Sequence, residues 1–124
     1  MERLLYICAG IAAFLGVALG AFAAHGLKSS LAPDMLAVFE TGVRYQMYHA
    51  FALFAAAWGA ARWPHKAFGA AGGLFVIGIV LFSGSLYLLA LTGTPWLGAI
   101  TPFGGMAFLT GWLCLCVGAW RGTR

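Results

Sequence analysis

The sequence predicts an all-α integral membrane protein, an antiparallel four-helix bundle with both termini on the cytoplasmic side. Apolar residues make up 63% of the chain and charged residues only 8%, whereas charged residues make up about 25% of a soluble domain. So few charges could not cover the surface of a soluble protein. Apolar runs near the ~20 residues that a helix needs to cross the hydrocarbon layer lie at 4–24, 42–61, 68–91 and 97–120.

The connections between these runs are short, so we expect a single membrane domain over 1–124 with antiparallel sequential neighbours. Cytoplasmic loops carry an excess of Lys and Arg, which makes these residues a guide to orientation. The side of the termini holds Arg3, Arg62, Lys66, Arg121 and Arg124, and the other side holds Lys28 and Arg44. The net charge of +4 therefore reflects orientation, and without a basic cluster we expect no nucleic-acid partner.

The first run, 4–24, includes an Ala-x-Ala sequence at 21–23 that could belong to a signal peptide. Its apolar stretch exceeds the roughly 7–15 residues of a signal-peptide core, so we interpret it as the first span. Small residues recur every four positions on one face, at Ala12, Gly16, Gly20 and Ala24. We expect them to let helices pack closely inside the bundle.

The segment 26–41 is the longest connection and lies on the external side. Pro33 and Asp34 suit the first turn of a helix, and Ser29 or Ser30 could cap it. We expect a short helix that lies at the interface or runs directly into the second span.

The third and fourth runs carry few polar residues. Ser83 and Ser85, in the third run, can bond to their own backbone or to a neighbouring helix. Pro102 is expected to kink the fourth span or to mark its start. Trp112 lies at mid-span and is interpreted as a packing residue, while His65, in a basic loop, is expected to be solvated.

The second run differs from the others because charged and hydroxyl-bearing side chains crowd its start. If this span begins at Gly42, Arg44 lies roughly 3 Å and His49 roughly 10 Å inside the membrane boundary, at ~1.5 Å per residue. Arg44 can extend to the interface. His49 cannot, so we expect it to be neutral and hydrogen-bonded. Glu40 precedes Arg44 by four residues, the favourable order for an ion pair on one helix.

Helical geometry spreads these polar groups around the turn. Glu40, Arg44 and Tyr48 share one side, Tyr45 and His49 the opposite side, and Gln46 lies about 60° beyond His49. Such a turn could not face lipid on any side without cost. We therefore expect other helices, the external segment or a second subunit to enclose it.

Two histidines, His25 and His49, fall on the external side of the predicted bundle. On neighbouring helices they could bind a haem or a metal, or flank a quinone. We favour the alternative in which His25 caps the first span and His49 ties helices together. A small external pocket is expected beside them. The partners expected for His49 are Ser83, Ser85, Thr101, a water or a ligand.

Four segments carry a family resemblance: GAFAAHGLK at 20–28, ETGVRYQMYHA at 40–50, FSGS at 82–85 and GAITPFGG at 98–105. They resemble the small inner-membrane proteins of domain-of-unknown-function family 423, over essentially the whole chain. The second segment is the most specific of the four. The resemblance implies a four-helix protein of the bacterial inner (plasma) membrane, or of the mitochondrial inner membrane in a eukaryote. It supplies no activity and no catalytic residue.

These features favour a non-enzymatic protein of the lipid bilayer, without cofactor or metal, that assembles with itself or as an accessory subunit of a larger membrane complex. Cys114 and Cys116 point about 200° apart on a helix, so they cannot share one metal. The alternatives are a small proton or solute transporter, and a quinone- or haem-binding redox module around His25, Arg44 and His49. Small multidrug-resistance transporters need a carboxylate deep in the first span, and 4–24 contains no acidic residue.

Overall fold

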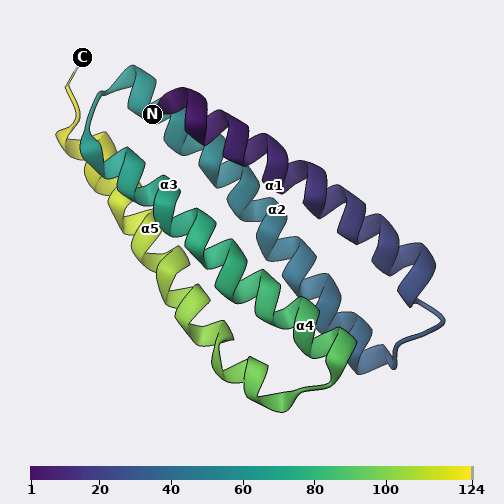
Figure 1. The fold of residues 1–124 in the computed structure, drawn as a ribbon. Helices are drawn as coiled ribbons and strands as arrows, with labels where there is room; N and C mark the ends of the chain where they lie inside the picture. Colours follow the sequence, from purple (N-terminus) through teal and green to yellow (C-terminus); the bar gives the residue numbers. More distant parts are fainter. Residues whose placement is uncertain (124) are drawn as a thin grey trace.

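The structure is a computed structural model that describes residues 1–123. Figure 1 shows four long helical stretches side by side, with the chain running back and forth and both termini at one end. Three of them, Glu2–Leu27, Lys66–Thr92 and Pro95–Arg121, are long and apolar enough to cross a membrane. Within residues 1–123 no strand is present. The predicted all-α, multi-pass membrane fold is therefore confirmed, and Arg124 lies outside the described residues.

The first stretch consists of α1 (Glu2–Phe22) and a π-helical segment, η1 (Ala23–Leu27). Gly16 and Gly20 face α2 (Pro33–Arg62). A methyl group added to Gly20 would lie 3.3 Å from Val43, and one added to Gly16 would collide with Met47. The small residues thus let the first two helices approach closely.

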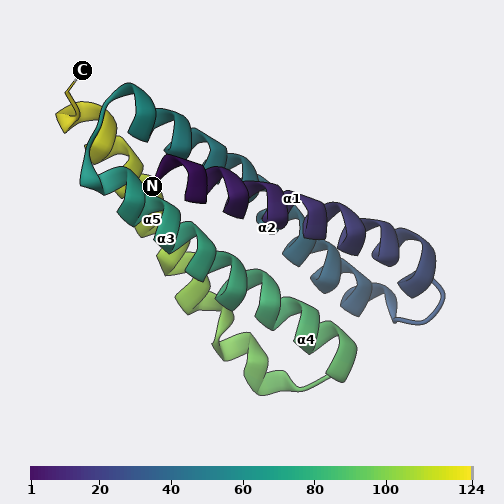
Figure 2. The same ribbon diagram turned by 45° about the horizontal axis from the view of Figure 1, so that its top comes forward.

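α2 is one continuous helix of 30 residues that covers both the expected external helix and the range 42–61 predicted as the second span. It is not among the three helices that are apolar enough to cross a membrane, so this part of the four-span prediction stays a prediction. Pro33 and Asp34 occupy its first turn, where the missing N–H of proline is harmless and negative charge is favourable. α2 contacts all the other long helices and lies between α1 and α3 (Lys66–Gly78) in Figure 1. Figure 2 shows the short loop that joins α1 to α2 at the end away from the termini.

The third stretch is interrupted by a π-helical segment in its middle. It consists of α3, η2 (Ile79–Ser83) and α4 (Gly84–Thr92). His65 caps its start, because its Nδ1 accepts the N–H of Ala67 at 3.1 Å. The side chain is half-buried, so the expectation that His65 is merely solvated was wrong. The stretch ends at Gly93, whose φ of +67° lies in the left-handed region that favours glycine.

The last stretch begins with a short 3-10 helix, η3 (Pro95–Ala99), and continues as α5 (Thr101–Arg121). Pro102 lies in the first turn of α5, so it marks the start of the helix and does not kink it. A methyl group added to Gly104 would lie 2.7 Å from the Cα of Phe82, and one added to Gly111 would lie 2.7 Å from the ring of Phe75. α5 therefore packs closely against the third stretch.

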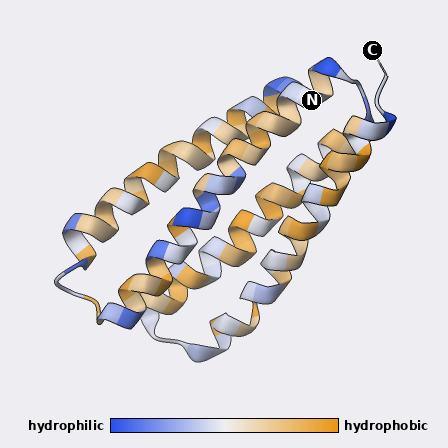
Figure 3. Ribbon diagram, turned by 180° about the vertical axis from the view of Figure 1, so that it is seen from behind, coloured by the Kyte–Doolittle hydropathy of each residue, from blue (hydrophilic) through white to orange (hydrophobic). Residues whose placement is uncertain are grey.

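Two apolar clusters fill the bundle, one toward each end. The larger includes Leu53, Phe75 and Phe108, and the smaller includes Leu27 and Phe39. The stretch of α2 between Phe39 and Leu53 therefore passes from one cluster to the other. Figure 3 shows hydrophilic residues in the middle of this helix, with apolar residues on either side. These polar residues form the candidate site.

Candidate functional site: a polar layer inside the bundle

Gln46 joins three helices from the inner face of α2. Its side chain is buried, with 3% exposure. The amide Nε2 donates to the carbonyl of Ala12 on α1 at 2.9 Å, and Oε1 accepts the hydroxyl of Tyr87 on α4 at 2.7 Å. One side chain thus ties α1, α2 and α4 together at the same level.

His49 lies one turn along α2 and joins it to α5. Its side chain is 4% exposed. Nδ1 lies 2.7 Å from the carbonyl oxygen of Tyr45, and Nε2 accepts the indole N–H of Trp112 at 3.1 Å. A carbonyl can only accept and an indole can only donate. The ring is therefore the neutral tautomer with its proton on Nδ1.

Aromatic rings hold the imidazole of His49 on several sides. It stacks on Phe108 with 3.5 Å between ring centroids and 7° between planes. Phe75 and Trp112 lie at centroid distances of 5.5 and 5.8 Å. Both ring nitrogens and the ring faces are thus occupied by groups of the chain itself.

The hydroxyl groups of the third stretch have other partners. Ser83 donates to the carbonyl of Gly42 at 2.6 Å. Ser85 lies 2.6 Å from the hydroxyl of Thr101 and donates to the carbonyl of Phe82 at 2.9 Å. The expectation that one of these hydroxyls would bind His49 was wrong. The third stretch runs antiparallel to α2, so Ser83 lies level with Gly42, about two turns away from His49.

The two histidines expected to share a pocket lie apart. His25 is exposed on η1, where the neighbouring Ala23 and Leu27 pack against Phe39 of α2. His49 follows Phe39 by ten residues, about 15 Å along the helix. The groove beside His49 does not include His25 among its lining residues.

The chain encloses only one side of the polar turn. Glu40 and Arg44 are both exposed, and Tyr45 and Tyr48 are 37% and 52% exposed. Gln46 and His49 point into the bundle, whereas the two charges and Tyr48 point outward. The single chain therefore encloses Gln46 and His49, as the sequence predicts, but leaves Glu40, Arg44 and Tyr48 uncovered.

A groove of about 390 Å³ opens between α2 and α5 beside His49. Its walls are mostly apolar, and they include Tyr45, Met106, Leu109 and Trp112. The polar atoms of His49 are already engaged with Tyr45 and Trp112. A molecule in this groove would therefore be held mainly by apolar contacts and by the fit of its shape, and less by hydrogen bonds.

The residues that form hydrogen bonds between the helices make up the polar layer, which consists of Gln46, His49, Ser83, Ser85, Tyr87, Thr101 and Trp112. Two of them, Tyr87 and Trp112, were missed as hydrogen-bonding residues. Tyr87 received no role from the sequence, and Trp112 was expected only to pack. The signal was present in the side chains, because a hydroxyl or indole N–H within a span needs an acceptor. Gln46 and His49 supply those acceptors.

The buried polar atoms of the polar layer all find hydrogen-bond partners. Throughout residues 1–123, every buried side-chain nitrogen and oxygen has a hydrogen-bond partner. The same part of the chain contains no cluster of three His, Cys, Asp or Glu side chains that could hold a metal. The observed arrangement can fix the register of four helices, because moving one helix along another would leave polar groups unpaired in an apolar surrounding.

Comparisons with known proteins place the chain among small membrane proteins. A family model described as "Protein of unknown function (DUF423)" matches residues 19–105. The UPF0382 membrane protein YwdK of Bacillus subtilis strain 168 is 47% identical over 118 residues, which cover 94% of this chain and 96% of that protein. The UPF0382 inner membrane protein YgdD of Escherichia coli K12 is 40% identical over 120 residues, which cover 97% and 92%. No solved structure matches the chain.

The matched residues 19–105 contain most of the polar layer, including Gln46, His49, Ser83 and Tyr87, whereas Trp112 lies beyond them. The relatives are named as membrane proteins, and their similarity extends over nearly the whole chain. Together with the apolar helices of the structure, these matches show that the chain is a multi-pass inner-membrane protein that belongs to the DUF423 family.

Proposed function

We propose that the protein is a non-enzymatic assembly module of the inner membrane. In this proposal the outward surface of α2 is the contact surface. Through it the protein associates with copies of itself, or joins a larger membrane complex as an accessory subunit. The main support is the distribution of polar groups. Those inside the bundle are all paired within the chain, whereas Glu40, Arg44 and Tyr48 point outward.

The outer face of α2 consists of residues that recur every three or four positions and are all exposed. They are Glu40, Arg44, Tyr48, Phe51, Ala55 and Trp58. Glu40 and Arg44 reach the headgroups at the membrane edge, whereas the hydroxyl of Tyr48 lies one turn deeper than Arg44, where an unpaired polar group is costly. A second protein surface relieves that cost by supplying hydrogen-bond partners and close packing. The outer face of α2 is therefore the surface through which we expect assembly.

The redox and transport alternatives receive less support. Both ring nitrogens of His49 are engaged with groups of the chain, so neither is free to ligate a haem. A proton path needs titratable groups in series across the membrane. The three acidic residues instead lie in the first turns of α1 and α2, at Glu2 and Asp34, and at the exposed Glu40.

Cysteine cross-linking in native membranes tests the assembly proposal. The three natural cysteines, Cys8, Cys114 and Cys116, are first replaced by alanine. Ala55→Cys then places one thiol on the outer face of α2, and Ala119→Cys places one on the exposed surface of α5 as a matched control. Oxidation should give a cross-linked species with Ala55→Cys and little with Ala119→Cys, on a non-reducing gel.

Mass spectrometry of the cross-linked band distinguishes a second copy from another subunit. Cross-linking that is equal at the two positions would mean random collision in the membrane. That result, or no cross-linking together with a monomeric protein in mild detergent, would contradict the proposal.

A further inference from the structure

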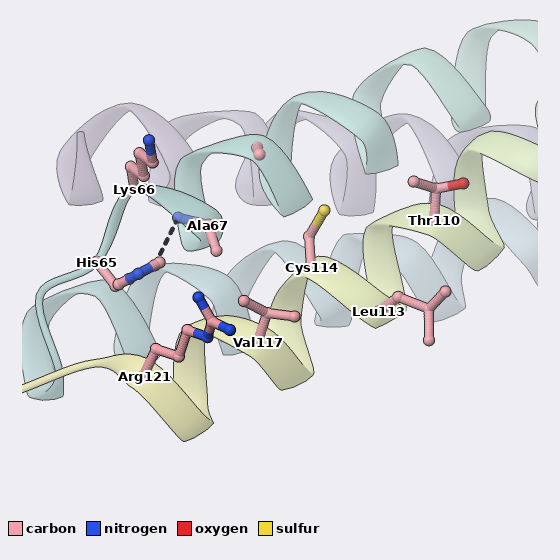
Figure 4. Close-up of a pocket in the computed structure, with 9 residues that line it drawn as sticks. His65, Lys66, Ala67, Thr110, Leu113, Cys114, Val117 and Arg121 are labelled. Atoms are coloured by element: carbon pink, nitrogen blue, oxygen red, sulfur yellow. Dashed lines mark hydrogen bonds between the residues drawn. The ribbon is translucent and has the colours of Figure 1, made fainter.

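A second cavity lies at the end of the bundle that holds both termini, well away from the outer face of α2. It has a volume of about 480 Å³ and opens between the start of α3 and the last turns of α5. Figure 4 shows the residues that line it. Neither the polar layer nor the proposed assembly surface uses this cavity, so its shape and charge need a separate explanation.

The lining is divided into a basic end and an apolar end. His65, Lys66 and Arg121 lie at one end. Figure 4 shows the Arg121 guanidinium beside Val117 and the ring of His65, whereas the side chain of Lys66 extends from the first turn of α3 away from Arg121. Toward the other end the walls include Leu113. A ligand that fits this lining has an anionic head and an apolar tail.

The basic end has donors available for an anion. His65 accepts the N–H of Ala67 through Nδ1, so its remaining ring N–H, on Nε2, can donate. Arg121 adds a cationic group at this end. The exposed side chain of Lys66 points away from it in Figure 4, and its flexible four-carbon stem allows the ammonium group to turn toward an anion bound there. None of the residues that line the cavity is acidic, so no carboxylate of the lining neutralises this charge.

The apolar end runs along the membrane. From Arg121 back to Thr110, the lining follows α5 for eleven residues, about 16 Å of helix axis. Trp120, beside the basic end, is 91% exposed, and exposed tryptophans at span ends favour the headgroup region. The basic end therefore lies at headgroup level, and the rest of the cavity lies at the depth of acyl chains.

We propose that this cavity binds an anionic phospholipid of the surrounding membrane. The phosphate interacts with Lys66 and Arg121, and the N–H of His65 donates to it. One acyl chain lies along Leu113 and Val117, between α3 and α5. Basic pockets between helices on the cytoplasmic side are suited to anionic headgroups, and the Lys and Arg distribution assigns this end of the bundle to that side.

Lipid binding to the full-length, delipidated protein in detergent tests the proposal by native mass spectrometry. The probes are phosphatidylglycerol and phosphatidylcholine with identical acyl chains. Phosphatidylglycerol should bind more tightly to the parent protein. The double variant Lys66→Gln/Arg121→Gln should lose about tenfold of that affinity. The control Arg3→Gln/Lys28→Gln removes the same charge outside the cavity and should retain the parent affinity.

A third variant, Ala70→Phe, narrows the cavity without changing its charge and should weaken binding of phosphatidylglycerol. It remains informative if the double variant does not fold. Equal affinity of the parent for the two lipids would overturn the proposal. So would equal losses in the double variant and its charge-matched control, or a folded Ala70→Phe protein that binds phosphatidylglycerol as the parent does.

Discussion

The partners of His49 determine which form of its ring can exist inside the bundle. Protonation would add a hydrogen to Nε2, which already accepts the N–H of Trp112. Two N–H groups would then point at each other, and the bond between α2 and α5 would be lost. In this arrangement His49 joins α2 to α5, and both of its ring nitrogens are engaged with groups of the chain.

Removal of the indole N–H should measure the strength of this tie. We expect Trp112→Phe to lower the free energy of unfolding by about 1–3 kcal/mol, because the buried Nε2 of His49 loses its donor. Thermal or denaturant unfolding in detergent, followed by circular dichroism, gives the difference. The control is Trp96→Phe, at a side chain that is 65% exposed. Equal stability of the two variants would show that the hydrogen bond contributes little.

The bond between Gln46 and Tyr87 allows a double-mutant cycle. Tyr87→Phe removes the donor and Gln46→Leu removes the acceptor, so the double variant should be more stable than the sum of the two losses predicts. We expect a coupling energy of about 0.5–1.5 kcal/mol, measured by unfolding in detergent. Tyr48→Phe, at an exposed hydroxyl, is the single-site control. If the losses of stability in the two single variants simply add up in the double variant, the hydrogen bond between Gln46 and Tyr87 does not contribute to stability.

At the residue scale, the sequence was sufficient to select Gln46 and His49 as polar groups that must be buried and paired. It could not assign their partners. The partners depend on which faces of four helices meet. α4 carries Ser85 and Tyr87 on different sides of an otherwise apolar helix, so its sequence does not indicate a single inward face. The side chains of Tyr87 and Trp112 signal that each needs an acceptor, but which acceptor each one uses could only be found once the helices had been placed.

At the element scale, a close contact between helix backbones explains a glycine in α5. A Cβ at Gly104 would lie 2.7 Å from the Cα of Phe82, which cannot move without shifting the third stretch. One at Gly105 would meet only the ring of Phe82, at 3.9 Å. Two adjacent glycines thus have different roles.

Alanine substitutions should separate these roles. Gly104→Ala is expected to destabilise the bundle by about 1–3 kcal/mol through overpacking. Gly105→Ala should be neutral or slightly stabilising, because alanine favours helix over glycine. Melting temperatures in the same detergent give the comparison. If the two substitutions change the melting temperature equally, α5 does not pack against the third stretch as closely as the structure shows.

The boundaries of the elements were partly predictable. Proline and acidic side chains in a first turn are local signals, so Pro33 and Asp34 indicated where a helix begins. Pro102 was compatible with a kink or with a helix start, and only the structure shows that it marks the start. The π-helical segments η1 and η2 were not predicted. Their sequences are apolar and compatible with a regular helix, so the local residues carry no signal for the wider turn. The interrupted third stretch is therefore visible only in the structure.

At the scale of the whole molecule, the orientation in the membrane stays a prediction that rests on Lys and Arg. Ser30 and Thr123 are both exposed. Ser30 lies in the loop between α1 and α2 and Thr123 lies beside the C-terminus, and Figure 1 shows that loop and the C-terminus at opposite ends of the bundle. In the cysteine-free protein, a membrane-impermeant maleimide applied to intact spheroplasts should label Ser30→Cys. It should reach Thr123→Cys only after lysis. Labelling of Thr123→Cys with protection of Ser30→Cys would reverse the orientation.

The length of α2 has a consequence for the membranes in which the protein is stable. Its 30 residues rise about 45 Å, some 15 Å more than the hydrocarbon layer of ~30 Å. In a thicker bilayer, the hydrocarbon layer extends over more of α2. Glu40 and Arg44 then lie in hydrocarbon and away from the headgroups, which costs free energy. We therefore expect the folded fraction to be higher in bilayers of short-chain lipids than in bilayers of long-chain lipids. Replacing both charges by leucine should reduce that difference.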